Sequence, residues 1–469
     1  MNPLKELDMR QRKALALTLI LPLCAVCSGA TAGPDAADYG KPAPKWLREA
    51  GMFNGWYAAW TDPMLDWVAG TPLIVTVQAN RDIIDKLHKR GVRVAQYVNA
   101  WLMYSAEGIN REITRRQQTG EFIHEDWWAM RESPVNQAMD LTLHPEWVVM
   151  GPEGYPRTNA LTSEEIYHGN TVGLQACPNA VGYREAMLAM VKNLMEMGED
   201  GVFMDCTEAF GGQKRCCAPE LGKHKHVHPD MNNAQVYLAL QKEIYDLVKS
   251  YGQDRVVLLN SSWNSEYLRC ADASMLESFI LTSSRYRWQN WEELQKMKRD
   301  TDPAIKAGKA VLALSYCGYT PNPIDEDAFY AYSCARLFGY AWADWFTLAD
   351  AHSTVLYRLI LGAPKGDILE YNGLLYRIFE EGVVVVNPYK AERELRIQTG
   401  HPFPLRDVMT NHRYAQGDLK ENLMQGQDMY KNWPVNLWVT IPGESGRVFI
   451  TGYLGKAGPP KVIGSGVAR

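Results

Sequence analysis

The sequence predicts an α/β fold, a (β/α)8 TIM barrel followed by a small antiparallel β-sandwich domain. Three observations lead to this prediction. Between about residues 45 and 355, amphipathic helical segments alternate with short apolar runs, which is typical of a parallel sheet covered by helices. No glycine-rich dinucleotide fingerprint follows the first apolar run, and this favours a closed barrel over an open doubly wound sheet. After residue 357, short β-like runs follow one another with no helical pattern between them.

The first 32 residues have the pattern of a secretory signal peptide. Basic residues precede an apolar run at positions 14–26, and Ala30-Thr31-Ala32 provides an A-x-A cleavage site. Because the apolar run is shorter than the roughly 20 residues of a membrane span, we expect export to a secreted or periplasmic location. An uncleaved anchor is the alternative. We expect no membrane segment in the mature form.

Composition and charge limit the class of partner. The chain has 469 residues, 46% hydrophobic and 22% charged, so it can bury a sizeable core. Its formal net charge of −5 argues against nucleic acid or an anionic membrane surface as the main partner, and we expect a monomer. Two of the nine cysteines, Cys24 and Cys27, lie in the signal segment, and the odd number that remains cannot all pair within one chain.

One stretch, residues 198–210, shows the repeating unit of the barrel most clearly. Gly198 ends a predicted helix, residues 201–204 form a short apolar run, and Asp205 follows directly. The run is too short for a helix and reads as a strand buried on both faces, which belongs in a parallel sheet. An acid at its carboxyl end lies where barrel enzymes place their chemistry. An aspartate that caps the next turn is the alternative.

The same unit recurs along the chain. Barrel strands are predicted at residues 52–60, 73–77, 92–98, 201–204, 255–259, 274–276, 310–314 and 340–346. Helices are predicted at residues 82–89, 183–197, 234–251, 291–297 and 329–337. A charged and aromatic insertion spans residues 106–150 and is expected to end in a strand at 147–150, before a loop at 151–178.

The chain is predicted to divide into four segments. The signal peptide spans residues 1–32, the barrel 45–355, the β-sandwich domain 356–455, and a Gly- and Pro-rich flexible tail 456–469. Strands of the second domain are predicted at residues 374–379, 382–386, 394–397, 435–441 and 447–451.

Two acids at strand ends predict the chemistry. Asp205 and Glu277 each follow a buried apolar strand directly and lie two strands apart, and glycoside hydrolysis requires such a pair. We expect Asp205 to be the nucleophile and Glu277 the general acid/base, since a partly desolvated glutamate keeps its proton nearer neutral pH. A salt-bridged residue on the rim is the alternative for Glu277.

Other polar and aromatic residues near strand ends are candidates for substrate binding. Trp60, Trp101, Trp263, Trp288 and Trp345 follow predicted strands, and we expect two or three of these indoles to stack on sugar rings. Glu208 is a further candidate, although a solvated place at a helix start fits it equally well. The predicted substrate-binding set is Trp60, Tyr97, Asn99, Trp101, Glu208, Asn260, Trp263, Tyr316 and Asp344.

Six short motifs recur in a known group of proteins; they lie at residues 91–98, 177–185, 198–205, 276–278, 376–379 and 382–388. These motifs resemble a loose group of barrel glycoside hydrolases, which includes endo-α-1,4-polygalactosaminidase-like enzymes and uncharacterised glycosyl-hydrolase-like families. The resemblance covers most of residues 50–450. It implies a barrel with an attached β-domain, and Asp205 and Glu277 as the catalytic pair; it leaves the sugar open.

A His-rich insertion after Asp205 suggests a metal site, but we expect no metal and no cofactor. Cys216-Cys217 lies close in sequence to His224, His226 and His228, a set of S and N ligands. The usual C-x-x-C spacing is absent, so a solvated loop or a local disulfide is favoured over a metal.

The function expected is therefore that of a secreted glycoside hydrolase with a carbohydrate substrate and a two-carboxylate mechanism. A carbohydrate-binding barrel without catalysis is one alternative. A metal-dependent hydrolase or deacetylase that uses the His-rich insertion is another. Whether the reaction retains or inverts the anomeric configuration depends on the carboxylate separation, roughly 5 against 6.5–9.5 Å.

Overall fold

The computed structural model describes most of the chain beyond the predicted signal segment. Asp35–Arg469 form one compact unit. The predicted signal peptide and the predicted tail at 456–469 lie outside the described residues. The described ranges are 36–56, 60–77, 80–99, 102–104, 106–120, 135, 138–139, 143–155, 173–205, 215–282, 287, 289–316, 326–344, 354–357, 359–399, 405–414 and 436–451.

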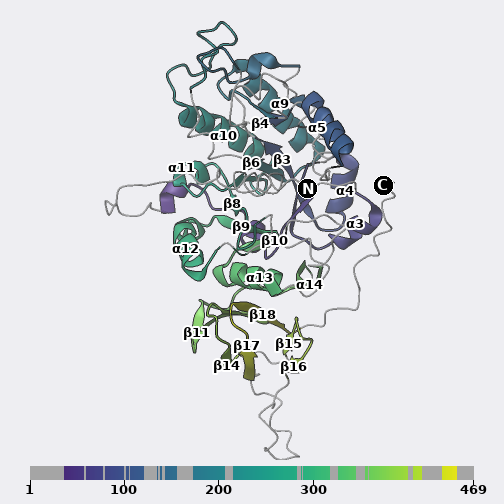
Figure 1. The fold of residues 1–469 in the computed structure, drawn as a ribbon, viewed down its shortest axis with the longest axis vertical. Coiled ribbons are helices and arrows are strands. Elements are labelled where there is room, and N and C mark those ends of the chain that lie inside the picture. Colours follow the sequence, from purple (N-terminus) through teal and green to yellow (C-terminus); the bar gives the residue numbers. More distant parts are fainter. Residues whose placement is uncertain are drawn as a thin grey trace, which may run out of the picture. The chain divides into compact units, whose positions relative to one another are not determined.

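Eight parallel strands form the predicted barrel (Figure 1), and backbone hydrogen bonds between its two ends close the ring. Met52 makes a parallel bridge with Trp342, where Phe53 N donates to Trp342 O and Trp342 N to Gly51 O, each at 3.1 Å. These bonds join the first strand to the last. In order around the ring, the strands are β1 (Asn54–Trp56), β2 (Leu73–Thr76), β3 (Arg93–Asn99), β6 (Gly201–Asp205), β7 (Val256–Asn260), β8 (Ala273–Leu276), β9 (Ala310–Ser315) and β10 (Ala341–Asp344).

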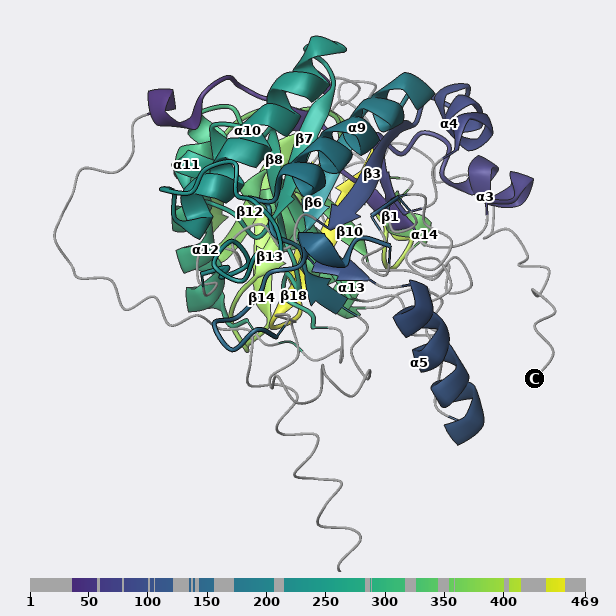
Figure 2. The ribbon, with the colours of Figure 1, turned by 90° about the horizontal axis from the view of Figure 1, so that it is seen from above.

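Helices cover the outside of this ring (Figure 2). Asparagine begins several of them: Asn232 and Asn290 each form a reciprocal capping box with the residue three positions on. Gly198 ends α9 in the left-handed conformation, with φ 105°, as its position in the sequence predicts. The helices are α2 (Lys45–Arg48), α3 (Asp62–Trp67), α4 (Arg81–His88), α5 (Ala106–Thr119), α9 (Val181–Met197), α10 (Asn233–Ser250), α11 (Ser265–Leu268), α12 (Trp291–Lys306), α13 (Glu326–Phe338) and α14 (Thr354–Tyr357), with the 3-10 turns η1 (Ala36–Tyr39) and η2 (Pro145–Trp147).

Side chains on the barrel strands alternate between the barrel interior and the helices. On β6, Phe203 belongs to an interior cluster that draws residues from strands around the whole ring, whereas Val202 and Met204 pack in a cluster with α9 and α10. On β7, Leu258 points inward and Val257 outward in the same way. Burial on both faces explains why these strands are continuously apolar in the sequence.

Two buried aspartates stabilise the amino ends of the strands. Asp200 precedes β6 and accepts a hydrogen bond from Val94 N at 2.9 Å, and Asp272 precedes β8 and accepts one from Val257 N at 2.8 Å. Each carboxylate therefore satisfies a backbone amide in the neighbouring strand. Lys249 lies 2.8 Å from Asp272 and compensates its charge. These contacts lie at the end of a barrel that serves stability rather than chemistry.

Lys309 is buried at the same end of the barrel and predicts a pH dependence of stability. It donates to Lys41 O and Ala271 O, and burial lowers its pKa to about 8 from 10.5. Between pH 8 and pH 10.5, Lys309 is protonated in the unfolded chain and deprotonated in the folded chain. The free energy of unfolding therefore rises with pH in this range, by up to about 1.4 kcal/mol per pH unit. Lys309→Met should remove this rise. Urea unfolding of the wild type and of Lys309→Met from pH 8 to 10.5 measures this difference. If the free energy of unfolding rose with pH equally in both proteins, Lys309 would not be the cause of the rise.

The insertion before α9 differs from the prediction. Residues 147–150 do not form a strand: Trp147 ends η2, and Val148 makes only an isolated antiparallel bridge with Ala176. Pro145 at the first position fixes a helical turn there instead. A two-stranded antiparallel sheet of β4 (Leu102–Tyr104) and β5 (Gly173–Gln175), which the sequence does not predict, borders the insertion.

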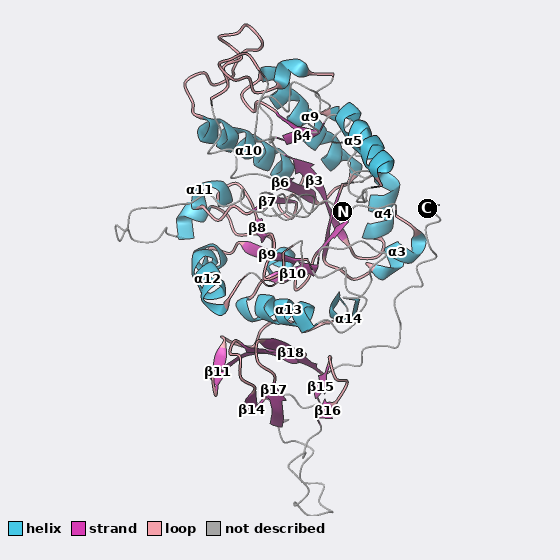
Figure 3. Cartoon of the chain, viewed as in Figure 1, coloured by secondary structure: helices cyan, strands magenta, loops and turns pink. Residues whose placement is uncertain are grey.

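The chain after α14 forms antiparallel sheets, as predicted (Figure 3). One sheet has six strands in the order β11-β12-β13-β18-β15-β16, and β14 pairs with β17 in a second. Apolar residues of both sheets share a core. The strands are β11 (Leu369–Tyr371), β12 (Leu374–Phe379), β13 (Gly382–Asn387), β14 (Arg393–Gln398), β15 (Leu405–Asp407), β16 (Arg413–Tyr414), β17 (Asn436–Ile441) and β18 (Ser445–Ile450).

Helix α13 joins the barrel to the antiparallel domain. It is buried along almost its whole length and lies in one apolar cluster with Trp342 of β10 and Val448 of β18. Gly446 permits the close approach, because a Cβ there would lie 2.5 Å from Ser333 Oγ. Burial on every face explains why α13 is apolar all round. None of the described helices is both long and apolar enough to span a membrane.

Candidate functional site

The predicted acids lie at one end of the barrel on the interior side of their strands. Asp205 ends β6 with the same orientation as Phe203, and Glu277 follows β8 with the same orientation as Met275, both of which belong to the interior cluster. Tyr316 belongs to that cluster itself. The parallel strands therefore bring both carboxylates to a shared mouth.

Five side chains form a continuous hydrogen-bonded network at this mouth. Tyr97 Oη donates to Asp205 Oδ2 at 2.5 Å, and Tyr316 Oη donates to Glu277 Oε1 at 2.5 Å. Asn260 Nδ2 lies between the acids, 2.6 Å from Asp205 Oδ1 and 2.9 Å from Glu277 Oε2. One amide group thus uses its two N–H donors on two different carboxylates.

The shared amide limits the separation of the acids. The two distances from Asn260 Nδ2 place Asp205 Oδ1 and Glu277 Oε2 at most about 5.5 Å apart. This is close to the roughly 5–5.5 Å of carboxyl pairs in retaining glycosidases and below the roughly 6.5–9.5 Å of inverting ones. Ser261 Oγ donates to Asn260 Oδ1 at 3.0 Å and keeps the amide in this orientation.

The backbone is strained beside the network. Ser261 follows Asn260 with φ 56°, and Ser278 follows Glu277 with φ 58°. Ile280 has φ 66°, which is an outlier for a β-branched residue. Such conformations persist only where surrounding contacts hold them, and they cluster at functional sites. No signal in the sequence marks these positions, since none is glycine.

Glu277 is exposed, which differs from the partial desolvation that we expected of an acid/base residue. It lies just past the end of β8, beyond the buried residues of the strand. Asp205 is half-buried and Asn260 is 9% exposed. The two acids therefore have different environments: Asp205 lies deeper in the mouth and Glu277 nearer to solvent.

The structure does not bring every predicted binding residue to the network. Asn99 pairs in register with Asp205 and is buried. Trp60 packs on an apolar cluster with α3 and α4, and Trp263 packs on two further clusters outside the barrel interior. Asp344 is fully buried on the side of β10 that Trp342 shares, away from the interior. Several predicted site residues lie outside the described residues: Trp101, Glu208, Trp288 and Trp345.

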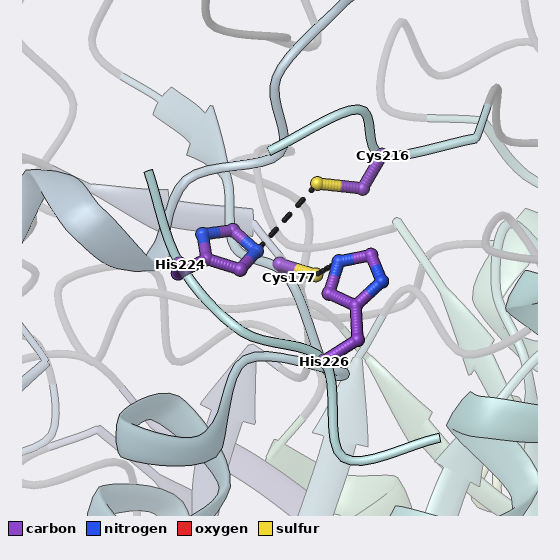
Figure 4. A group of neighbouring side chains, drawn as sticks. All are labelled: Cys177, Cys216, His224 and His226. Atoms are coloured by element: carbon purple, nitrogen blue, oxygen red, sulfur yellow. Dashed lines mark hydrogen bonds between the residues drawn. The ribbon is translucent and has the colours of Figure 1, made fainter. Parts of the chain in front are cut away.

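The His-rich insertion contains a second cluster of reactive side chains (Figure 4). Cys177, Cys216, His224 and His226 place one ligand atom each within 4.8 Å of one another. The sequence does not associate Cys177 with this cluster, because Cys177 lies just before α9, far along the chain from the insertion. The hydrogen bond between the two thiols, together with the His224 and His226 rings, lowers the pKa of Cys216, and the same bond and burial raise the pKa of Cys177.

A cavity of about 430 Å³ borders this cluster. None of the five network residues is among the described residues that line it. Its walls are formed by Val149, Cys177, Pro178, Asn179, Arg215, Cys216, His226, Pro229, Met231, Asn232, Asn233, Ala234 and Val236.

Solved structures similar to this chain are distant from it. The glycoside hydrolase domain of PelA from Pseudomonas aeruginosa is 14% identical over 63% of this chain and 93% of that chain, with a TM-score of 0.40. The native debranching enzyme of Nostoc punctiforme is 12% identical over 88% and 100%, with a TM-score of 0.47. Ega3 of Aspergillus fumigatus, in complex with galactosamine, is 11% identical over 66% and 95%, with a TM-score of 0.38. At such scores these likenesses carry no conclusion about this chain.

A family model gives a firmer assignment. The model described as hypothetical glycosyl hydrolase family 15 matches residues 130–383, more than half of the chain. The match includes Asp205, Asn260, Glu277 and Tyr316. No curated protein matches the chain. The resemblance to barrel glycoside hydrolases is thereby confirmed at the level of the family. The chain belongs to hypothetical glycosyl hydrolase family 15 and is, by family, a glycoside hydrolase.

Proposed function

We propose that this glycoside hydrolase cleaves an oligo- or polysaccharide with retention of the anomeric configuration. Asp205 attacks the anomeric carbon, and Glu277 protonates the departing oxygen. Glu277 then deprotonates the water that releases the sugar from Asp205. The observation that carries the proposal is the amide of Asn260, which holds the two carboxylates at the spacing of a retaining pair.

The different environments of the acids support these roles. Both oxygens of Asp205 accept hydrogen bonds, from Tyr97 and Asn260, and these bonds hold the carboxylate in one orientation for attack. Glu277 lies closer to solvent, where it can exchange its proton with water and deliver the water of the second step. The sequence pattern of an exported protein and the net charge of −5 support a proposed extracytoplasmic carbohydrate substrate rather than a nucleic acid.

The stereochemical course tests the proposal directly. Purified protein is incubated with a panel of neutral, acidic and amino-sugar polysaccharides, and reducing ends are measured. NMR then identifies the first anomer formed from any glycan that is cleaved. We expect the anomer of the substrate to form first. The matched control is the double variant Asp205→Asn, Glu277→Gln. Initial formation of the opposite anomer would contradict retention, and glycan binding without cleavage would support a binding barrel instead.

Tyr97→Phe should slow the reaction while leaving the fold intact. The change removes the donor that lies 2.5 Å from Asp205 Oδ2. Because a hydrogen bond to a charged group contributes roughly 1.5–3 kcal/mol, kcat should fall about 10- to 100-fold. The control is Tyr376→Phe in β12, far along the chain from the barrel. Equal rates in wild type and Tyr97→Phe would show that this bond does not act on the nucleophile.

A further inference from the structure

Two cysteines and two histidines from separate segments converge at one point. Cys177 lies between β5 and α9, whereas Cys216, His224 and His226 lie in the connection from β6 to α10. Figure 4 shows the two imidazole rings and the two thiols directed toward a common centre. We propose that these four side chains bind one Zn²⁺ in a closed, structural site.

The distances match a tetrahedral site. Cys177 Sγ lies 3.6 Å from His226 Nε2, and Cys216 Sγ lies 3.6 Å from His224 Nε2. With Zn–S bonds of about 2.3 Å and Zn–N bonds of about 2.0–2.1 Å, a tetrahedron places S and N about 3.6 Å apart. All four ligand atoms lie within 4.8 Å of one another, so a single ion can contact them with small side-chain shifts.

The ligand set selects the ion. Two thiols and two imidazoles in tetrahedral arrangement favour zinc, whereas calcium and magnesium require oxygen ligands. Four protein ligands leave no position for water or substrate, which distinguishes a structural site from a catalytic one. The cluster therefore does not support the alternative of a metal-dependent hydrolase.

A backbone amide contacts one of the two sulfur atoms. Met150 N donates to Cys216 Sγ at 3.4 Å. Such a second-shell donor stabilises negative charge on the sulfur and fixes its orientation. On the other side of the cluster, Ala180 N donates to Cys177 O at 2.9 Å and holds Cys177 in the turn that begins α9, so this half of the site is preformed.

The described part of the insertion has few buried apolar side chains. Between residues 215 and 231 only Cys216 and Ala218 are buried, while Leu221 and Val227 are exposed. The hydrophobic contribution to its stability is therefore small. Asn179 binds the far end of the segment, where its Oδ1 accepts from His228 N at 2.7 Å and its Nδ2 donates to His228 O at 2.9 Å. Zinc would join this insertion to the start of α9 by four further bonds.

Metal content tests the proposal without reference to activity. Full-length protein is purified without chelator, and its zinc content is measured by inductively coupled plasma mass spectrometry. We expect one zinc per chain in the wild type and in the controls Cys217→Ser and His228→Asn, which alter neighbouring residues outside the cluster. Cys216→Ser and His224→Asn should lose the metal. Replacement of zinc by Co²⁺ should give the thiolate charge-transfer and ligand-field bands of a tetrahedral site.

A second measurement uses only wild-type protein, so it does not depend on whether the variants fold. Wild-type protein is treated with a chelator, and Tm is measured before and after Zn²⁺ is returned. Removal should lower Tm by several degrees and Zn²⁺ should restore it, because an ion bound only by the folded state stabilises that state. A Cys177–Cys216 disulfide in non-reducing peptide mapping would overturn the proposal. So would a chelator-treated protein with unchanged Tm, or zinc content unaffected by Cys216→Ser.

Discussion

Asp205→Asn should lower kcat by more than about 10³-fold, the largest effect expected of any single change in this protein. An amide cannot attack the anomeric carbon or balance its positive charge. The fold should survive, because the asparagine can turn its oxygen toward Asn260 Nδ2 and its nitrogen toward Tyr97 Oη, which is able to accept. The measurements are kcat on a cleaved glycan and Tm.

Azide identifies the role that Asp205 plays. In Asp205→Ala a cavity replaces the carboxylate, and added azide can take the place of the nucleophile. We expect a glycosyl azide of inverted configuration and a partial return of turnover. The matched control is Asp300→Asn on α12, where the exposed carboxylate pairs with Lys296, and its rate should equal that of the wild type. Full turnover in Asp205→Asn would exclude this residue as the nucleophile.

Glu277→Gln should slow cleavage by an amount that depends on the leaving group. General acid catalysis contributes roughly 10²–10⁴-fold, so glycosides with sugar or alcohol leaving groups should react slower by about that factor. Aryl glycosides with very acidic leaving groups need no protonation, and their first step should keep a rate near that of the wild type. The glutamine preserves contacts with Tyr316 and Asn260.

Rates for a series of aryl glycosides measure this dependence. The slope of log(kcat/KM) against leaving-group pKa should be steep for Glu277→Gln and shallow for the wild type. Azide should accelerate the second step in the variant and give a product of retained configuration, the reverse of the result at Asp205. If kcat/KM fell by the same factor for every leaving group, Glu277 would not be the general acid and would act only as a positioning residue.

The barrel, and the place of Asp205 and Glu277 at its mouth, could be predicted because the signals are local. A buried parallel strand is continuously apolar, and the residue that follows it lies at the mouth of the barrel. The catalytic roles of the two acids stay predictions. Helix ends were predicted equally well where a glycine such as Gly198 takes the left-handed conformation. The predicted strand at residues 147–150 was wrong because Pro145 at the start of a turn outweighed the β-propensity of the apolar residues after it.

Orientation and long-range contacts could not be predicted. Asp344 ends an apolar strand just as Asp205 does. It lies on the same face of β10 as Trp342, however, so its side chain is on the helix side of the strand. The approach of Cys177 to the His-rich insertion depends on how two loops meet, which no sequence spacing records. The role of Asn260 as a donor to both acids depends on the stagger of three neighbouring strands.

The gap between the two acids is determined by a side chain that belongs to neither of their strands. Asn260 reaches from β7 to a carboxylate on each side. In an evolving lineage, a change of one codon at position 260 could widen that gap and admit a water molecule while Asp205 and Glu277 themselves stay the same. Under the proposed mechanism, the stereochemical outcome of this scaffold can thus evolve separately from Asp205 and Glu277.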